Sequence, residues 1–385
     1  MRIVFLETVQ NFGGARISTV ELAARLSEKH EILILDTYGS CQPFVDFVAE
    51  KGIDLTIAMP RSAPFIIGSS ANKLKTLYNL IRFIPHWFKL RLNVHKIIKN
   101  FNADQVIVNN SKVLSLLVFF RKKHFKTILF ARGWFIPKQI RPKDKLLYKL
   151  LVDKYVCVAE ATRQAIYAGG FATLENIYVV HNAIAPERLP QQVAIINDSV
   201  ECVKILHSAG FLPAKGIHIS IEIAKILKDK GFKFKLIVTG LIYKGHVSKS
   251  YYNRILKTIK EYDLSDVVII VENNPNVIPY FRACDILIHP SATEGLPRVV
   301  MEGMALKKPV IANAVGGVTD YILHNFTGFI SNYNNLNDYV NYIELLANDK
   351  NLYNRIADNA YSLIINSFNE KMQVESFDNL FLSKL

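Results

Sequence analysis

The chain has 385 residues, enough for two domains with separate cores, and half of its residues are hydrophobic. No apolar run approaches the roughly 20 residues that a membrane-spanning helix needs. Its beginning, MRIVFLETVQ, lacks the apolar stretch of a signal peptide, and its four cysteines show neither metal nor disulfide spacing, so we expect a cytoplasmic protein. The formal charge of +14 favours an anionic membrane or a phosphorylated substrate, with ordinary solubility charge as the alternative. Nucleic acid is the least supported of the possible anionic partners because no binding motif for it is present, and we expect none.

The first half of the chain alternates apolar strands with helices. Strands are expected at residues 2–7, 31–38, 54–59, 105–109, 127–131, 155–159 and 177–180, and helices at 17–29 and 43–51. This alternation predicts a parallel, doubly wound sheet, whose ligands bind beyond the carboxyl ends of the strands. Arg132 follows one such end and is a candidate contact for phosphate or an acidic acceptor, with a surface arginine as the alternative. The first loop, with Gly13 and Gly14, lacks a G-x-G-x-x-G pattern, which argues against a nicotinamide cofactor.

Residues 71–101 are the most unusual segment of this half. Lysines and arginines alternate there with Leu, Ile, Phe and Trp87, and Pro85 is expected to interrupt the helix. A basic amphipathic helix with aromatic residues is typical of proteins that bind a membrane surface. The alternative is a helix packed on its own sheet with its lysines in solvent. The basic stretches 121–123 and 138–149 add charge and favour the membrane.

A second series of strands and helices follows a linker with several prolines and glutamines at residues 185–200. Strands are expected at 203–208, 234–239, 267–271, 286–288, 310–312 and 328–330, with a helix at 216–230 and helical structure from 336 to the end.

The stretch DILIHPSATEGLPRVVMEGMALKKPVIANAVGG, residues 285–317, predicts a strand, a loop, a helix and another strand. Pro297 is expected in the first helical turn, where proline is favoured. The loop places Gly295 and backbone N–H groups at a helix N-terminus, which attracts phosphate. Glu294 and Glu302 flank that position, and carboxylates accept hydrogen bonds from vicinal hydroxyls. The alternative is that Glu294 caps the helix and Glu302 forms a surface pair with Arg298.

Glu294 and Glu302, separated by seven residues, resemble the E-x7-E motif of retaining glycosyltransferases of the family 4-like group, and residues 289–330 are similar to that family's donor site almost throughout. The resemblance implies the GT-B fold, an α/β architecture of two Rossmann-like, doubly wound domains facing a central cleft. The expected boundaries are residues 1–182 for the acceptor-side domain, 183–200 for the hinge, 201–365 for the nucleotide-sugar domain and 366–385 for a helix that crosses back.

The loop AGFLPAKG, residues 209–216, resembles the family's second donor motif, usually an arginine and a lysine that clamp the diphosphate. Lys215 matches the lysine, whereas Phe211 stands where arginine is usual; Arg298 is a conjectural substitute. The resemblance also implies donor contacts from Gly13, Gly14, Gly210, Glu294, Gly295, Leu296, Pro297 and Glu302. Arg132 stands near the position of a catalytic-site histidine in many relatives, so that histidine has no counterpart here.

The implied function is metal-independent, retaining transfer of a hexose from a UDP- or GDP-linked sugar, with no other cofactor, to a glycan or lipid-linked acceptor. Glu294, Lys215 and Arg132 are the catalytic candidates, and assembly of lipopolysaccharide, capsule or a lipid-linked oligosaccharide, with the protein peripheral on the inner membrane face, is a further hypothesis. A nucleotide-sugar 2-epimerase of the same fold and a non-catalytic sugar-nucleotide-binding protein are the alternatives. No D-x-D sequence indicates a metal.

Overall fold

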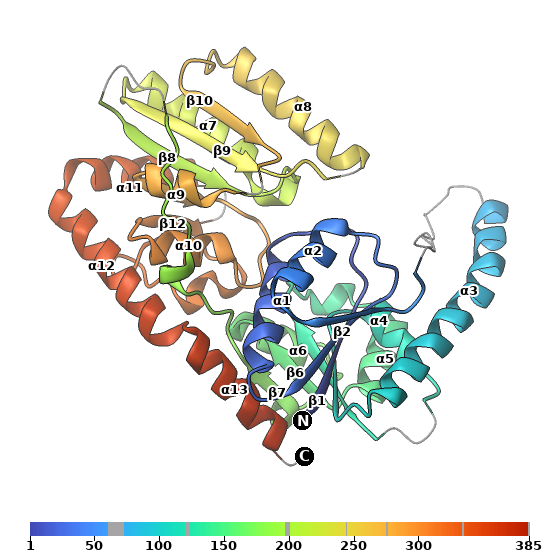
Figure 1. Cartoon of the computed structure of the whole chain (residues 1–385). Helices are drawn as coiled ribbons and strands as arrows, with labels where there is room; N and C mark the ends of the chain where they lie inside the picture. Colours follow the sequence, from blue (N-terminus) through green and yellow to red (C-terminus); the bar gives the residue numbers. More distant parts are fainter. Residues whose placement is uncertain are drawn as a thin grey trace. The chain divides into compact units, whose positions relative to one another are not determined.

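The computed structural model describes residues 1–60, 73–120, 124–196, 201–243, 245–274, 276–332 and 335–383, with the backbone alone for 73–80 and 82. It divides into two compact units (Figure 1). Unit 1 comprises Met1–Val158, Thr162–Val180 and Val374–Leu385, and unit 2 comprises Ala159–Ala161 and His181–Gln373.

Unit 1 contains a parallel sheet of seven strands in the order β3-β2-β1-β4-β5-β6-β7, which confirms all seven predicted strands. The strands are β1 (Arg2–Glu7), β2 (Glu31–Asp36), β3 (Asp54–Ile57), β4 (Gln105–Val108), β5 (Lys126–Ala131), β6 (Lys154–Cys157) and β7 (Ile177–Val179). The helices are α1 (Gly14–Leu26), α2 (Gln42–Glu50), α3 (Lys73–Asn100), α4 (Ser111–Leu114), α5 (Pro142–Leu151) and α6 (Glu160–Ala168).

Both faces of the unit 1 sheet are covered, which explains why its strands are continuous apolar runs. On one face, Val4 and Leu6 of β1 join a core with residues of α3, α4, α5 and α6. On the other face, Phe130 of β5 packs edge-to-face with Phe377 of α13 (Glu370–Leu382). The buried Lys154 amine donates hydrogen bonds to the carbonyl oxygens of Leu380 at 2.6 Å and Ser383 at 2.7 Å, so the end of the chain is fastened to β6.

Helix α3 corrects one prediction, because it continues through Pro85 instead of breaking there. Proline removes one helical hydrogen bond, that to the carbonyl four residues earlier. Pro85 and Ile81 are both exposed, so water can satisfy the carbonyl that is left over. The basic residues 121–123, like 71–72, lie outside the described residues.

Unit 2 contains a parallel sheet of six strands in the order β10-β9-β8-β11-β12-β13, and all six predicted strands are present. The strands are β8 (Val203–Ser208), β9 (Phe234–Gly240), β10 (Val268–Glu272), β11 (Ile286–His289), β12 (Val310–Asn313) and β13 (Phe329–Ser331). The helices are α7 (Ile217–Asp229), α8 (His246–Glu261), α9 (Ile278–Ala283), α10 (Arg298–Ala305), α11 (Leu336–Asn348) and α12 (Lys350–Ser367), and unit 2 also holds the first turn of α13.

The segment expected as a linker packs on unit 2 as far as residue 196. Arg282 Nε donates to the carbonyl oxygen of Pro190 at 2.6 Å, and the backbone amide of Ala194 donates to Pro279 at 2.9 Å. Residues 197–200 lie outside the described part of the chain. None of the described helices is both long and apolar enough to cross a membrane.

The strand order of each unit reverses at one point, between β1 and β4 in unit 1 and between β8 and β11 in unit 2. Loops that leave neighbouring strands on either side of such a reversal diverge, and ligands of open parallel sheets bind in the crevice between them. Ligand sites are therefore expected at the loops after β1 and β4 in unit 1, and at the loops after β8 and β11 in unit 2.

Candidate functional site

The loops after β8 and β11 bring together two residues that the sequence analysis selected separately. Lys215 ends the short turn Pro213–Lys215 after β8, and Glu294 lies in the loop between β11 and α10. Lys215 Nζ donates to Oε1 of Glu294 at 2.7 Å, and Nε2 of His289, the last residue of β11, lies 2.9 Å from the same oxygen. Both contacts fall on Oε1, so Oε2 of Glu294 takes part in neither.

Glu294 is 9% exposed, and its charge is stabilised by these two neighbours. Burial raises the pKa of a carboxyl group because it disfavours the charged form. The hydrogen bonds and charges of His289 and Lys215 outweigh that effect and lower the pKa of Glu294 to about 2. Glu294 is therefore a fixed, ionised acceptor of hydrogen bonds. It does not cap α10, whose N-cap is Pro297, one residue before the helix rather than in its first turn.

Two glycines allow the loops around Glu294 to approach one another closely. Gly216 and Gly316 have φ angles of +73° and +56°, in the left-handed region that side chains disfavour. A Cβ at Gly216 would collide with the carbonyl of Pro290, and a Cβ at Gly316 with the carbonyl of Glu294. The backbone amide of Gly317 also donates to the carbonyl of Gly295 at 2.6 Å. Only glycine fits where these backbones meet.

The predicted site residues Leu296 and Pro297 carry the connection into α10. Asn182 Nδ2 donates to the carbonyl oxygen of Leu296 at 3.2 Å. The hydroxyl of Tyr321 donates to the carbonyl oxygen of Pro297 at 3.1 Å. These two bonds hold the backbone that leads from Glu294 to Arg298.

Arg298 and Glu302 form the ion pair that the sequence offered as the alternative to a binding role for Glu302. Arg298 Nε lies 3.3 Å from Oε1 of Glu302, one helical turn away on α10. Their side chains are mostly buried, so this is not an ordinary surface pair. The pair places a cation and an anion together at the start of α10.

Phe211, which occupies the position usual for the clamp arginine, belongs to the core of unit 2. It is fully buried and packs edge-to-face on Tyr252 of α8, with 5.0 Å between ring centroids. The structure therefore offers no space at residue 211 for a cation that reaches a ligand.

His207, at the penultimate position of β8, is a buried neighbour of the ion pair. Its Nδ1 lies 2.7 Å from the hydroxyl of Ser220. Burial, with the nearby charges of His289 and Lys215, lowers the pKa of His207 to about 3. The imidazole is therefore neutral at physiological pH.

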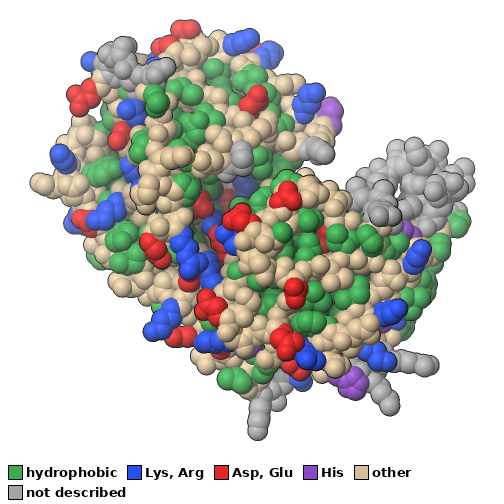
Figure 2. Space-filling view, in the orientation of Figure 1, with side chains coloured by type: hydrophobic (Ala, Val, Ile, Leu, Met, Phe, Trp, Pro, Cys, Tyr) green, Lys and Arg blue, Asp and Glu red, His purple; other side chains and the backbone are tan. Residues whose placement is uncertain are grey.

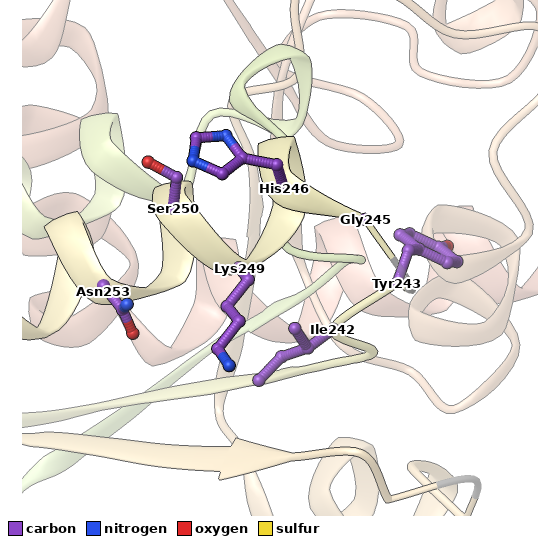
Figure 3. Close-up of a pocket in the computed structure, with 7 residues that line it drawn as sticks. All are labelled: Ile242, Tyr243, Gly245, His246, Lys249, Ser250 and Asn253. Atoms are coloured by element: carbon purple, nitrogen blue, oxygen red, sulfur yellow. The ribbon is translucent and has the colours of Figure 1, made fainter. Parts of the chain in front are cut away.

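A cavity of about 410 Å³ lies beside the start of α8. Tyr243 lines this cavity, and its ring also lies against Gly210. Figure 3 shows Tyr243 and Gly245 on the loop before the helix, and His246, Lys249, Ser250 and Asn253 on its first turns. A Cβ at Gly210 would collide with the ring of Tyr243. Burial and the charge of Glu294 raise the pKa of the Tyr243 hydroxyl, which keeps it protonated.

Unit 1 has a charged cluster at its own reversal point, around Glu7 at the end of β1. Arg16 Nη1 lies 2.7 Å from Oε2 of Glu7, and Asn109 Nδ2, which follows β4, donates to Oε1. Arg132, after β5, donates from Nη1 to the carbonyl of Ala15 at 2.6 Å and stacks on Phe130 at 4.1 Å.

Ala15, which Arg132 contacts, directly follows Gly13 and Gly14, the N-cap and the first residue of α1. Both predicted glycines and Arg132 therefore lie at one place in unit 1. The predicted residues of the second half all lie in unit 2.

The sequence did not predict four of these residues: Glu7, Arg16, His289 and Tyr243. Glu7 did carry a signal, because it is the acidic end of an otherwise apolar strand, RIVFLE. His289 is likewise a polar residue that directly follows the apolar run of a strand. Arg16 and Tyr243 have no local signal, because their partners lie in other loops.

Comparison with known proteins shows what the second half of the chain is similar to. Residues 195–363 match the family model of glycosyl transferases group 1. An uncharacterized glycosyltransferase of Methanocaldococcus jannaschii is 33% identical over 209 residues, which cover 54% of this chain and 53% of that protein. The capsular polysaccharide biosynthesis glycosyltransferase CapM of Staphylococcus aureus is 30% identical over 182 residues, 44% of each chain. The chain thus spans about half the length of these two relatives.

The crystal structure of Anabaena Alr3699/HepE in complex with UDP-glucose superposes with a TM-score of 0.79 at 19% identity and covers 99% of both chains. A likeness at this identity shows the fold. It confirms the GT-B architecture of two Rossmann-like domains that the resemblance implied.

Proposed function

We propose that the chain is a retaining glycosyltransferase, because residues 195–363 match the family model of glycosyl transferases group 1. It transfers a sugar from a nucleotide-diphosphate donor to a glycan or lipid-linked acceptor. The observation that carries the proposal is the arrangement of Glu294, which Lys215 and His289 hold through Oε1 at the reversal point of the unit 2 sheet. Its second oxygen, Oε2, can accept a hydrogen bond from a sugar hydroxyl.

The donor would bind along the loops after β8, β9 and β11. Lys215 and Arg298 supply positive charge to the diphosphate, and backbone amides near Gly295 add hydrogen-bond donors. Glu302 holds the ribose, and Glu294 the donor sugar. The cavity beside Tyr243 presents Lys249 and the first turn of α8 to the same nucleotide.

The reaction we propose is attack on the same face of the sugar that the diphosphate leaves. The acceptor hydroxyl oxygen forms a bond to the anomeric carbon, and the bond from that carbon to the diphosphate oxygen breaks. The leaving diphosphate takes the proton of the acceptor hydroxyl. Lys215 stabilises the negative charge that develops on the leaving group. We propose that no metal is needed, because the chain has no D-x-D sequence.

In unit 1, we propose that Arg132 and Arg16 contact an anionic group of the acceptor. Capsular polysaccharide assembly, the process named for the S. aureus relative, is the kind of pathway that would supply such an acceptor. The proposed location is the cytoplasm, on the inner face of the membrane.

The test is a thermal-shift and calorimetric screen of UDP, GDP, ADP and CMP against the wild type, Glu302→Ala and Lys215→Ala. Ligand at about 100 times its Kd raises stability by about 2.7 kcal/mol, so even modest affinity is measurable. We expect one nucleotide to bind the wild type and both variants to bind it more weakly.

Lys257→Ala, which removes an exposed lysine of α8 paired with Glu261, is the matched control and should bind as the wild type does. If no nucleotide binds, or if neither site variant changes binding, the donor site is wrongly assigned. The products are then analysed for sugars linked to the nucleotide that binds, with and without an acceptor. A product that needs the acceptor indicates transfer, an epimer formed without it indicates 2-epimerisation, and no product indicates binding alone.

A further inference from the structure

The helix α3 exposes a second apolar face in addition to the one that it buries. Leu90, Val94 and Ile98 are buried in the core of unit 1. Four other apolar side chains, 45–60% exposed, form a stripe along the same helix: Ile81, Ile84, Phe88 and Leu92. At 100° per residue these four positions fall within an arc of about 80°, centred roughly 120° from the buried face.

Phe119 extends this apolar surface beyond the helix. Arg91 of α3 donates from Nη2 to the carbonyl of Phe119 at 2.9 Å and lies 5.5 Å from the centre of its ring. The ring itself is 75% exposed. We call Ile81, Ile84, Phe88, Leu92 and Phe119 the α3 stripe. A group of exposed apolar side chains of this kind marks a site of interaction.

The charged residues of the helix that carries the stripe are all positive. Lys89, Lys96 and Lys99 are exposed on the same helix, and its 28 residues contain seven Lys and Arg and no Asp or Glu. Residues 55–143 contain 17 Lys and Arg and a single acidic residue, Asp104, for a net charge of +16, whereas the rest of the chain has a net charge of −2. The positive charge is therefore concentrated in this part of unit 1 and is not spread over the surface for solubility.

We propose that the α3 stripe and its flanking lysines dock unit 1 on a lipid bilayer that contains anionic lipids. Apolar side chains enter the boundary between headgroups and acyl chains, while lysines along the same helix reach the phosphates. A second copy of this chain would bring the same positive charge to the interface and be repelled. A soluble polyanion would satisfy the lysines and leave the apolar stripe in water. Figure 1 shows α3 in light blue as the long helix of unit 1.

The test is co-sedimentation of the full chain with vesicles of phosphatidylcholine alone and of phosphatidylcholine with phosphatidylglycerol, at low and high salt. We expect binding to the anionic vesicles that weakens as salt rises, because salt screens the attraction. Lys89→Gln with Lys96→Gln should lower the apparent affinity about tenfold. Phe88→Ser with Leu92→Ser should lower it by about tenfold or more at either salt concentration, because the loss is of apolar burial.

The matched control is Leu323→Ser with Phe326→Ser, which removes two side chains of unit 2 that are 50% and 52% exposed. It should bind vesicles as the wild type does. Circular dichroism of each variant shows whether the fold is kept.

The proposal is overturned if the wild type does not bind anionic vesicles at low salt, or if the stripe variant binds as tightly as the wild type. It is also overturned if the lysine variant loses binding to vesicles while the stripe variant keeps it, and if the lysine variant loses binding to heparin to the same extent. The surface would then be a site for soluble polyanions. A dimer in solution that the stripe variant dissociates would assign the stripe to a second copy. Vesicle binding is measured without nucleotide, so this outcome is independent of the proposed transferase activity.

Discussion

Lys215 and Glu294, 79 residues apart in the sequence, form an ion pair of 2.7 Å between Nζ and Oε1. The pair joins the loops that leave β8 and β11 on opposite sides of the strand-order reversal. His289 shares the same carboxylate oxygen. Two donors from different loops therefore hold one oxygen of the Glu294 carboxylate in place, and Oε2 takes part in neither contact.

The first prediction concerns the pH dependence of stability. The pKa of Glu294 is about 2 in the folded chain and 4.5 as its ordinary value, so the ionised carboxylate stabilises the fold at neutral pH. That contribution, at most about 3 kcal/mol, is lost as the pH falls from about 4.5 towards 2. Glu294→Gln should therefore be less stable than the wild type at pH 7, and the difference should shrink in acid, as measured by urea unfolding.

Glu261→Gln, an exposed carboxylate that pairs with Lys257, is the control and should follow the wild type at every pH. A constant difference between Glu294→Gln and the wild type from pH 7 to pH 2.5 would contradict the ionised state assigned to Glu294.

The second prediction concerns Phe211. Replacing it with arginine, the residue that the resemblance implies at this position, should destabilise unit 2 by more than about 3 kcal/mol, since a charge would be buried without a partner. Nucleotide affinity should not rise, because the side chain points into the core. Phe211→Leu, which keeps an apolar side chain, should cost clearly less. Tighter nucleotide binding by a folded Phe211→Arg would show that the position faces the donor after all.

The third prediction compares two glutamates that pair with arginine in unit 1. Glu7 is 1% exposed and pairs with Arg16, whereas the Glu31 side chain is 65% exposed and pairs with Arg2. Glu7→Ala should reduce the free energy of unfolding by about 3 kcal/mol, because it leaves a mostly buried arginine without this partner.

Glu31→Ala should cost less than about 1 kcal/mol, as is usual for an exposed pair. Chemical denaturation of both variants gives the comparison. Equal losses would mean that the cluster around Glu7 contributes no more than a surface pair.

Much of the fold could be predicted because it depends on patterns of residues that are close together in the sequence. Each strand is a short apolar run bounded by polar residues, and all thirteen expected strands are present in the two sheets. The loop that contains Glu294 was found because a strand, a loop and a helix follow one another within some twenty residues. Pro85 shows the limit of this reasoning, since the helix continues through a proline at an exposed position where the sequence predicts a break.

The sequence by itself determined the two parallel sheets, the order of their elements along the chain and the strand–loop–helix unit that holds Glu294 and Glu302, because periodicity and turn chemistry act between near neighbours. Only the tertiary structure decided that Lys215 and His289 share one oxygen of Glu294, that Phe211 belongs to the core and that α3 leaves an apolar stripe exposed. Those facts depend on which distant segments lie beside one another, and the strand order of each sheet sets that arrangement.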